Sequence, residues 1–291
     1  MKTAWVFPGQ GSQFAGMEAD LATTAIAQER FQSAETLLNW SVLAKCQGDE
    51  EELSQTLYTQ PCLYVIESIL VDLLRERGQQ PAYVAGHSLG EYSALYAAGV
   101  FDFETGLSLV QKRAALMSDA QGGKMAALIK FDPPQLAALL SANPAVVLAN
   151  DNSAEQGVIS GPAADVEKVL SQVKAKRVVP LKVSGAFHSP SMAQAAQVFA
   201  GVLESVVFRD AQVPVLSNVD PTPGDRQEVL KERLIQQITG GVRWRETLLN
   251  LPSLGVEALW EVGPGKVLTG LAKRTCPDLA LKNISQLSDL P

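Results

Sequence analysis

The sequence is poor in cysteine and histidine: its 291 residues include three cysteines and two histidines. The cysteines, Cys46, Cys62 and Cys276, are odd in number, far apart and without C-x-x-C spacing. They therefore indicate neither a disulfide framework nor a zinc site, and such a chain suits a reducing compartment. We expect a cytoplasmic protein.

Positive charge is also scarce. Lysine and arginine together number 24 against 31 acidic residues, which gives a formal net charge of −7. A general nucleic-acid-binding protein carries a basic surface, so we expect no nucleic-acid partner. The overall charge still allows an acidic protein partner to dock on a local basic patch.

Long apolar runs and a targeting segment are missing as well. No apolar run approaches the roughly 20 residues that span a bilayer, so we expect no membrane partner. Residues 1–7 are too short for a signal segment and lead into Pro8-Gly9, so they predict a first strand. With 46% hydrophobic and 19% charged residues, the chain predicts a globular protein with one large core and an inserted subdomain, or with two domains.

The most informative stretch that is present is Gly86-His87-Ser88-Leu89-Gly90. Residues 81–85 predict a short buried strand before it, and residues 91–99 predict a helix after it. A G-x-S-x-G pattern between strand and helix is typical of a nucleophile elbow, where the serine meets free N–H groups at the helix N-terminus. An ordinary tight turn with a serine cap is the alternative reading of this pattern.

The pattern changes between residues 124 and 183. This region predicts strands at 125–129, 145–149, 157–160 and 177–183, helices at 133–142 and 163–173, and a turn at 150–153. The order β-α-β-β-α-β is typical of a ferredoxin-like subdomain, with hinges at glycines 122, 123 and 185. The rest of the chain predicts α/β structure, with helices at 17–38, 60–74, 103–120 and 227–238 and strands at 213–219 and 258–262.

Two further residues are candidates for a functional site. Arg113 lies on the flank of the apolar stripe of helix 103–120, and a buried guanidinium needs a partner. His188 is the one histidine outside the elbow, and a serine nucleophile needs a base with a pKa near neutrality. The alternatives are a structural ion pair or a partly exposed arginine, and a structural or solvent-exposed histidine.

Three motifs together resemble the malonyl-CoA:acyl carrier protein transacylases of bacteria. They are Gly-Gln-Gly-Ser-Gln at 9–13, Gly-His-Ser-Leu-Gly-Glu at 86–91 and Glu-Val-Gly-Pro-Gly-Lys at 261–266. The resemblance covers essentially the whole chain. It implies an α/β-hydrolase-like core formed by residues 1–123 and 185–291, and a ferredoxin-like inserted subdomain at 124–184.

The resemblance also implies the catalytic roles. Ser88 would attack the malonyl thioester, and His188 would take its proton and later activate the acceptor thiol. Gln237 would orient His188 through its backbone carbonyl, in place of the aspartate of a triad. The backbone N–H groups of Gln10 and Leu89 would form the oxyanion hole.

Substrate recognition follows from the same resemblance. Arg113 would pair with the free malonyl carboxylate, and Phe187 and His87 would contact the substrate. Phe187 before a histidine matches the malonyl-selecting form of this motif, because polyketide acyltransferases that take methylmalonyl usually carry serine there. An acidic carrier protein needs a basic patch near the mouth of the site, and the candidates are Lys182, Lys266, Lys273 and Arg274.

The implied reaction moves a malonyl group from malonyl-CoA to the phosphopantetheine thiol of acyl carrier protein and supplies fatty acid synthesis. No cofactor is implied, because malonyl-CoA is a substrate, and we expect a monomer. Three alternatives remain: the acyltransferase subunit of a malonate decarboxylase, a serine hydrolase with the same elbow, and a non-catalytic carrier-binding module. A hydrolase would leave Arg113 without a purpose and should have an acidic triad member.

Overall fold

Alternating side chains along β1 (Thr3–Phe7) determine how the larger sheet is covered. Ala4 and Val6 join an apolar cluster with α11 (Trp244–Ser253) and α12 (Val267–Thr275). Trp5 and Phe7 join the main core on the opposite face, with α4 (Thr56–Glu76) and α6 (Phe103–Ser118). Because successive side chains of a strand point to opposite faces, this one strand contributes to both apolar layers.

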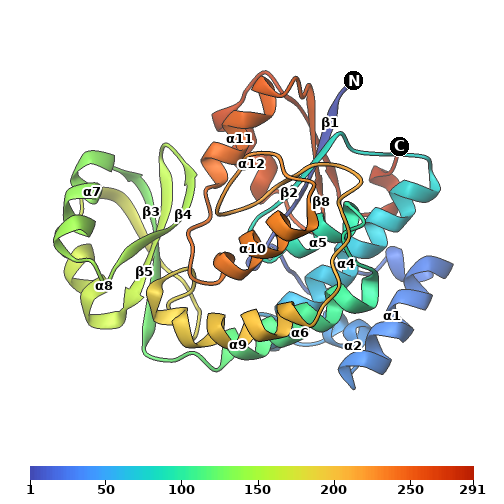
Figure 1. Ribbon diagram of the computed structural model, residues 1–291, viewed down its shortest axis with the longest axis horizontal. Coiled ribbons are helices and arrows are strands. Elements are labelled where there is room, and N and C mark those ends of the chain that lie inside the picture. The colour runs from blue at the N-terminus through green and yellow to red at the C-terminus, as the bar shows by residue number, and fades with distance from the viewer.

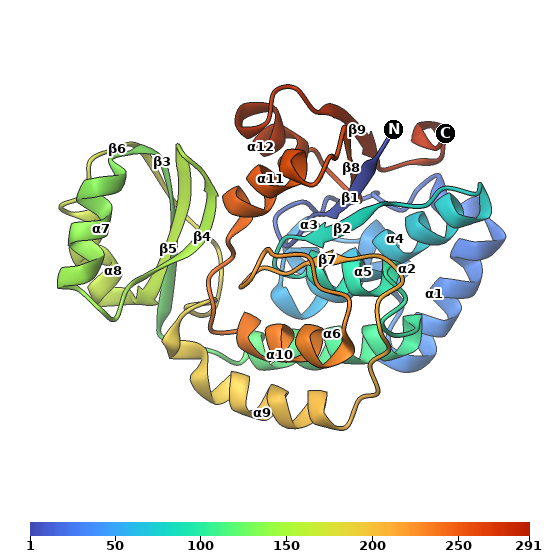
Figure 2. The same ribbon diagram turned by 45° about the horizontal axis from the view of Figure 1, so that its top comes forward.

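The computed structural model describes all 291 residues. Figures 1 and 2 show the larger sheet between helices, and the smaller sheet with two helices at one end of the molecule. The remaining strands are β2 (Tyr83–Gly86), β3 (Gly123–Phe131), β4 (Val147–Ser153), β5 (Gln156–Pro162), β6 (Ala175–Pro180), β7 (Val215–Leu216), β8 (Ala258–Val262) and β9 (Ala280–Ile284). The remaining helices are α1 (Ala25–Leu38), α2 (Val42–Gln47), α3 (Glu50–Leu53), α5 (Gly90–Ala97), α7 (Pro133–Ala142), α8 (Ala163–Leu170), α9 (Ala193–Glu204) and α10 (Gln227–Gln237), with short 3₁₀ helices η1 (Leu21–Thr23), η2 (Pro190–Met192) and η3 (Leu287–Asp289).

The larger sheet is entirely parallel, with the strand order β7-β2-β1-β8-β9. Helices cover both of its faces, as burial of a parallel sheet requires. Strands β1 and β2 are neighbours near its middle, so the loops that follow them lie side by side at the same edge. These two loops carry residues 8–13 and the elbow.

The smaller sheet is antiparallel, with the order β4-β5-β3-β6. Helices α7 and α8 cover one face, and their apolar residues form a separate small core with the sheet. The predicted β-α-β-β-α-β order is confirmed. The turn predicted at 150–153 is wrong: β4 continues to Ser153, and the chain reverses at Ala154 and Glu155. The polar residues of β4 are held in the strand because Asn150 pairs with Val242 and Asp151 pairs with Arg245.

The α/β class and most of the predicted elements are confirmed. Helix α1 begins at Ala25, not at residue 17, because residues 15–23 form turns and the short helix η1. Helix α4 is longer than predicted and is by length and composition apolar enough to cross a membrane, so the expectation of no such run was too strict. Most of α4 is buried in the core, however, which is what a central helix of a globular protein shows.

The glycines of the elbow can be tested for their contribution to the fold. A Cβ on Gly90 would lie 2.1 Å from the carbonyl oxygen of Phe7, which belongs to β1 and cannot move freely. We expect Gly90→Ala to lower the free energy of unfolding by about 3 kcal/mol, because the helix must move away from the strand. Gly201 is the matched control: it is an exposed glycine in α9 with open space around it.

Gly201→Ala should raise stability by up to about 1 kcal/mol, the difference in helix propensity between the two residues. Urea denaturation followed by circular dichroism measures both changes. Equal effects of the two substitutions would contradict the close packing of α5 against β1.

Candidate active site

The elbow places Ser88 between β2 and α5 in a backbone conformation that side chains rarely adopt. Its φ is +53°, and a residue other than glycine in this region stores about 1–3 kcal/mol of strain. Glycine is required before it, because a Cβ on Gly86 would lie 1.9 Å from the carbonyl group of Gly90. The strand and the helix therefore approach closely and place the serine at the wall of a small pocket.

His188 lies against the serine. Its Nε2 is 2.7 Å from Ser88 Oγ, and its Nδ1 is 2.9 Å from the carbonyl oxygen of Gln237 and 3.0 Å from that of Gly240. Carbonyl oxygens only accept, so Nδ1 carries the proton and Nε2 is free to accept from the serine hydroxyl. His188 also has a positive φ of +56°, so both members of the pair are strained.

The pKa of His188 is lowered to about 3. Burial is the largest cause, and the positive charge of Arg113 acts in the same direction, whereas the two carbonyl contacts oppose the shift. An imidazole in this environment is neutral at physiological pH and can accept a proton.

Arg113 of α6 is almost completely buried, at 1% exposure, beside the serine. Its Nη2 donates to Ser88 Oγ at 3.0 Å and to Gln237 Oε1 at 3.1 Å, and its Nη1 donates to Gln60 Oε1 at 2.8 Å. No carboxylate lies within ion-pair distance of the guanidinium, and its Nε has no partner. A buried cation that has only neutral acceptors is available for an anion.

Two backbone N–H groups border the same space. Those of Gln10, in the loop after β1, and Leu89, at the start of α5, donate to no acceptor in the protein. The N–H of Ser88 itself is engaged, because it donates to Asn218 Oδ1 at 2.7 Å. The Gln10 side chain is fixed separately through its bond to Thr56 Oγ1 at 3.1 Å.

The pocket beside Ser88 has a volume of only about 80 Å³. Its walls include all the residues predicted for catalysis, the oxyanion hole and substrate binding except Gln237. The side chain of Gln237 contacts Arg113, which is one of the lining residues. The lining residues are Gln10, Gln60, His87, Ser88, Leu89, Arg113, Met117, Met125, Asn150, Leu181, Val183, Phe187 and His188. Space of this size admits a small acyl group.

His87 points away from the serine hydroxyl. Its Nε2 lies 2.8 Å from Asn152 Oδ1, and its ring packs edge-on against Trp244 at 5.5 Å. Burial lowers its pKa, so the ring is neutral and Nε2 carries the proton that faces the amide oxygen. His87 thereby joins the elbow to β4 of the smaller sheet.

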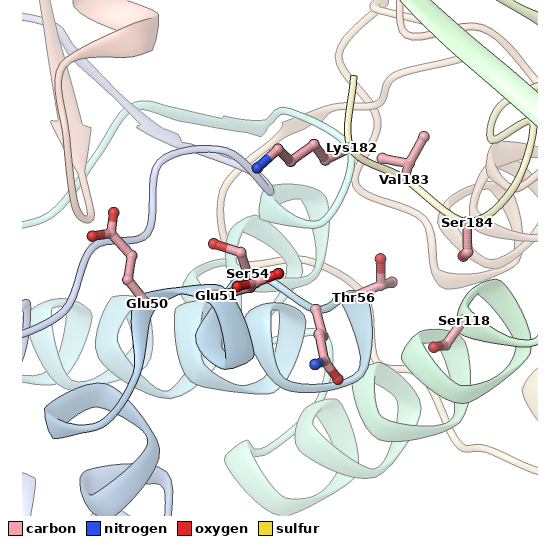
Figure 3. A pocket seen from close by; sticks show the side chains of 9 residues that line it. Glu50, Glu51, Ser54, Thr56, Ser118, Lys182, Val183 and Ser184 are labelled. Atoms are coloured by element: carbon pink, nitrogen blue, oxygen red, sulfur yellow. The ribbon is translucent and has the colours of Figure 1, made fainter. Parts of the chain in front are cut away.

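A larger polar cavity of about 580 Å³ adjoins this pocket and shares Val183 with it (Figure 3). Lys182 lines this cavity together with Glu50 and Glu51 at the start of α3. The other predicted carrier-binding residues lie elsewhere: Lys266, Lys273 and Arg274 belong to α12 and the residue before it, and Arg274 lines a separate cavity of about 480 Å³ with Arg245. The structure therefore places two of the four candidates on α12 and a third at its N-cap, and separates Lys182 from them.

Several residues at the site were missed in the sequence. Gln60, Glu91, Asn152, Asn218 and Gly240 all contact predicted site residues. Glu91 follows the elbow motif directly, which is the one signal that could have indicated it. The others come from distant segments, and their spacing in the sequence carries no information. The described residues contain no cluster of three or more histidine, cysteine or acidic side chains suited to a metal ion.

The profile of the acyl transferase domain matches residues 4–287. The chain belongs to this acyl transferase family. It is 67% identical over 290 residues, covering 100% of this chain and 99% of the relative, to the malonyl CoA-acyl carrier protein transacylase of Synechocystis sp.. The corresponding enzyme of Escherichia coli K12 is 39% identical over 297 residues, with 98% and 96% coverage.

Solved structures of the family agree with the fold of this acyl transferase. The crystal structure of the Synechocystis transacylase matches with a TM-score of 0.98 and 99% coverage of both chains. A malonyl-transacylase solved in complex with a type II polyketide synthase acyl carrier protein matches with a TM-score of 0.94 at 38% identity, covering 99% of this chain and 97% of that one. The membership expected from the three motifs is confirmed.

The low pKa of His188 predicts an unusual pH dependence for the reactivity of Ser88. The neutral imidazole accepts the serine proton, and protonation near pH 3 would abolish this, so the rate of modification should be constant from about pH 5 to 8. Labelling of Ser88 by a neutral fluorophosphonate measures this without a titrating substrate. A half-loss of rate near pH 6.5, the ordinary range of histidine, would contradict the assignment.

Proposed function

We propose that this acyl transferase moves a malonyl group from malonyl-CoA to the phosphopantetheine thiol of acyl carrier protein through a malonyl-Ser88 intermediate, and supplies fatty acid synthesis. The full-length relatives named above support the substrates. The observation that carries the proposal is the buried Arg113, which lies 3.0 Å from the nucleophile and has no anionic partner of its own. Malonyl is a small acyl group that carries such an anion.

In the first half-reaction, Ser88 Oγ attacks the thioester carbonyl while its proton passes to His188 Nε2. The negative charge on the carbonyl oxygen accepts hydrogen bonds from the N–H groups of Gln10 and Leu89. The carbon–sulfur bond then breaks, and His188 returns the proton to the departing sulfur of coenzyme A. The second half-reaction reverses these steps: His188 takes the proton of the carrier thiol, and the sulfur attacks the malonyl ester of Ser88. The bond between the acyl carbon and Ser88 Oγ then breaks, and His188 returns the proton to the serine.

The orientation of His188 by backbone carbonyls suits this chemistry. The carbonyl oxygens of Gln237 and Gly240 occupy the position where a triad aspartate would lie, and they are neutral. A neutral partner leaves the imidazole a weaker base than a carboxylate does. A weaker base suffices for a thiol, which is far more acidic than water, and the 80 Å³ pocket limits the access of water to the ester.

Arg113 supplies specificity. A guanidinium can donate two parallel bonds to a carboxylate, and burial strengthens the interaction because water does not screen it. Phe187 and His87 line the same pocket and bound the space beside the acyl group. The reaction of a serine hydrolase does not require a buried arginine beside the nucleophile. Arg113 therefore supports the transfer of an acidic acyl group and argues against a serine hydrolase.

We propose that the fold consists of two parts. Residues 1–123 and 185–291 form an α/β-hydrolase-like core, and residues 124–184 form a ferredoxin-like inserted subdomain. The strand–elbow–helix arrangement around Ser88 supports the first assignment, and the antiparallel order β4-β5-β3-β6 supports the second. The enzyme acts as a monomer in the cytoplasm, without a cofactor. The three cysteines are free, which fits a reducing compartment.

The acidic carrier docks at the end of α12 in this proposal. Lys273 and Arg274 are exposed there, and Arg245 borders the same cavity as Arg274. Lys266 begins the helix on the side of the loop that carries Gln10, since Gly265 packs against Ser12. Lys182 faces the carboxylates of Glu50 and Glu51 across another cavity, which makes it the weakest of the four candidates.

The assignment of the nucleophile is tested by Ser88→Ala. We expect no malonyl-enzyme to form, while the free energy of unfolding changes little, because one hydroxyl contributes little to stability. Mass spectrometry after mixing with malonyl-CoA should show an adduct of about 86 Da on the wild-type protein and none on the variant. An adduct that persists in the variant would exclude Ser88.

The assignment of the substrate is tested by Arg113→Ala. Loss of one partner of a desolvated ion pair costs about 3–5 kcal/mol, so malonyl transfer should lose about two to four powers of ten in kcat/KM. Acetyl transfer should be unchanged or improved, because acetyl leaves the guanidinium unpaired. Lys112→Ala, which removes an exposed cation on the same helix, is the matched control and should change neither rate.

Arg113→Lys should recover only part of the malonyl activity, because an ammonium cannot form the paired bonds. Transfer of both acyl groups is measured from their CoA thioesters to the carrier. An equal loss of malonyl and acetyl transfer in Arg113→Ala would mean that the arginine is structural.

A further inference from the structure

The peptide of Ser88 is held at both ends by side chains from distant segments. Its N–H donates to Asn218 Oδ1 at 2.7 Å, and its carbonyl oxygen accepts from Gln237 Nε2 at 2.9 Å. Asn218 follows β7, and Gln237 is the last residue of α10. These contacts come in addition to the ordinary bond from the N–H of Glu91 at the start of α5.

The buried carboxylate of Glu91 joins the two side chains. Its Oε2 accepts from Gln237 Nε2 at 2.7 Å and from the backbone N–H of Asn218 at 3.2 Å. Asn218 Nδ2 in turn donates to the carbonyl oxygen of Gly86 at 2.5 Å, just before the elbow. Glu91, Asn218 and Gln237 are each no more than 2% exposed, so water does not compete for these bonds.

These bonds can stabilise the left-handed backbone conformation of Ser88. Strain of this size persists only where surrounding contacts determine the backbone. Relaxation of φ toward negative values would swing the side chain and carry Oγ away from His188 Nε2, and catalysis is sensitive to displacements of about 1 Å. The reaction described above uses none of the side-chain atoms of Asn218, Glu91 or Gln237.

We propose that the side chains of Asn218 and Gln237, joined by Glu91, are positioning residues that hold the Ser88 peptide in its reactive conformation. This inference rests on the proposed role of Ser88 as the nucleophile. It gives Gln237 two separate tasks: its backbone carbonyl orients His188, and its side chain holds the serine. A substitution at position 237 removes the second task and leaves the first in place.

Asn218 and Gln237 differ in whether they bond to Arg113, and this difference can be tested. Gln237 Oε1 accepts from Arg113, so a change there also affects the guanidinium. No hydrogen bond joins Asn218 to Arg113. Asn218→Ala should therefore slow acylation by malonyl and by acetyl thioesters by the same factor, whereas Gln237→Met should slow both and also change their ratio.

The experiment measures single-turnover acylation of Asn218→Ala and Gln237→Met by the malonyl and acetyl thioesters of N-acetylcysteamine. Gln236→Met is the matched control, because Gln236 is exposed in the same helix and its side chain bonds only to Glu232. Labelling of Ser88 by a neutral fluorophosphonate gives two separate quantities: the fraction of molecules labelled, which is the amplitude, and the rate constant of labelling. Unfolding lowers the amplitude, whereas a misplaced serine lowers the rate constant of the molecules that remain folded.

We expect the rate constants of Asn218→Ala to fall about 10- to 100-fold for both thioesters and for the fluorophosphonate, with KM within about threefold of the wild type. Gln236→Met should match the wild type. Rate constants within about threefold of the wild type in both Asn218→Ala and Gln237→Met would overturn the inference. If the wild-type protein is not labelled at Ser88, the proposed function fails instead, so the two failures are distinguishable.

Discussion

The burial of an unpaired guanidinium beside a serine hydroxyl is the constraint on which this site depends. Desolvation opposes the charge of Arg113 and lowers its pKa. The protein offsets part of this cost with the amide oxygens of Gln60 and Gln237, and with the ring of Tyr92 at 5.4 Å from the guanidinium carbon. Glu91, which is bonded to Gln237 but forms no ion pair with the arginine, also opposes the fall in pKa. These residues belong to helices α4, α5 and α10, so the position of the arginine on α6 depends on how all four helices pack.

The positive charge of Arg113 also affects the protonation of His188. It acts with burial to keep His188 neutral, and the imidazole is held by carbonyl oxygens that add no negative charge. A substrate carboxylate on Arg113 would bring a negative charge directly against the guanidinium. In the proposed reaction, binding of the malonyl carboxylate would therefore change the electrostatic environment of Ser88 and His188 directly.

Backbone strain is the second feature of the site. Four residues other than glycine have positive φ, and two of them are Ser88 and His188. The bonds to Asn218 and Gln237 hold the first, and the carbonyl oxygens of Gln237 and Gly240 orient the second. Gln237 thus takes part in holding both residues, so the end of α10 is as important to the geometry as the elbow itself.

Much of this architecture was predictable from the sequence, because it depends on local patterns. The elbow was visible as a strand, G-x-S-x-G and a helix, and the smaller sheet as a β-α-β-β-α-β order. The prediction was wrong at residues 150–153, because their polar side chains are typical of a turn. These residues form a strand because Val242, Arg245 and His87 pair with them from distant segments.

The supporting residues of the site were not predictable for the same reason. Asn218 lies 130 positions after Ser88, and nothing around it distinguishes it from any other loop asparagine. Helix α9 and the edge strand β9 (Ala280–Ile284) were also missed. The resemblance indicated Gln237 for its backbone carbonyl, but the contacts of its side chain with Arg113, Ser88 and Glu91 appear only in three dimensions.

The roles of Ser88 and Arg113 are tested most directly by a crystal structure of the malonyl-enzyme, formed with malonyl-CoA in the absence of an acceptor thiol. We expect an ester on Ser88 whose carbonyl oxygen lies within hydrogen-bond distance of the N–H groups of Gln10 and Leu89. We also expect the malonyl carboxylate to lie about 2.7–2.9 Å from the terminal nitrogens of Arg113. A malonyl carboxylate directed away from Arg113, toward the 580 Å³ cavity or solvent, would contradict the role of the arginine in binding the substrate.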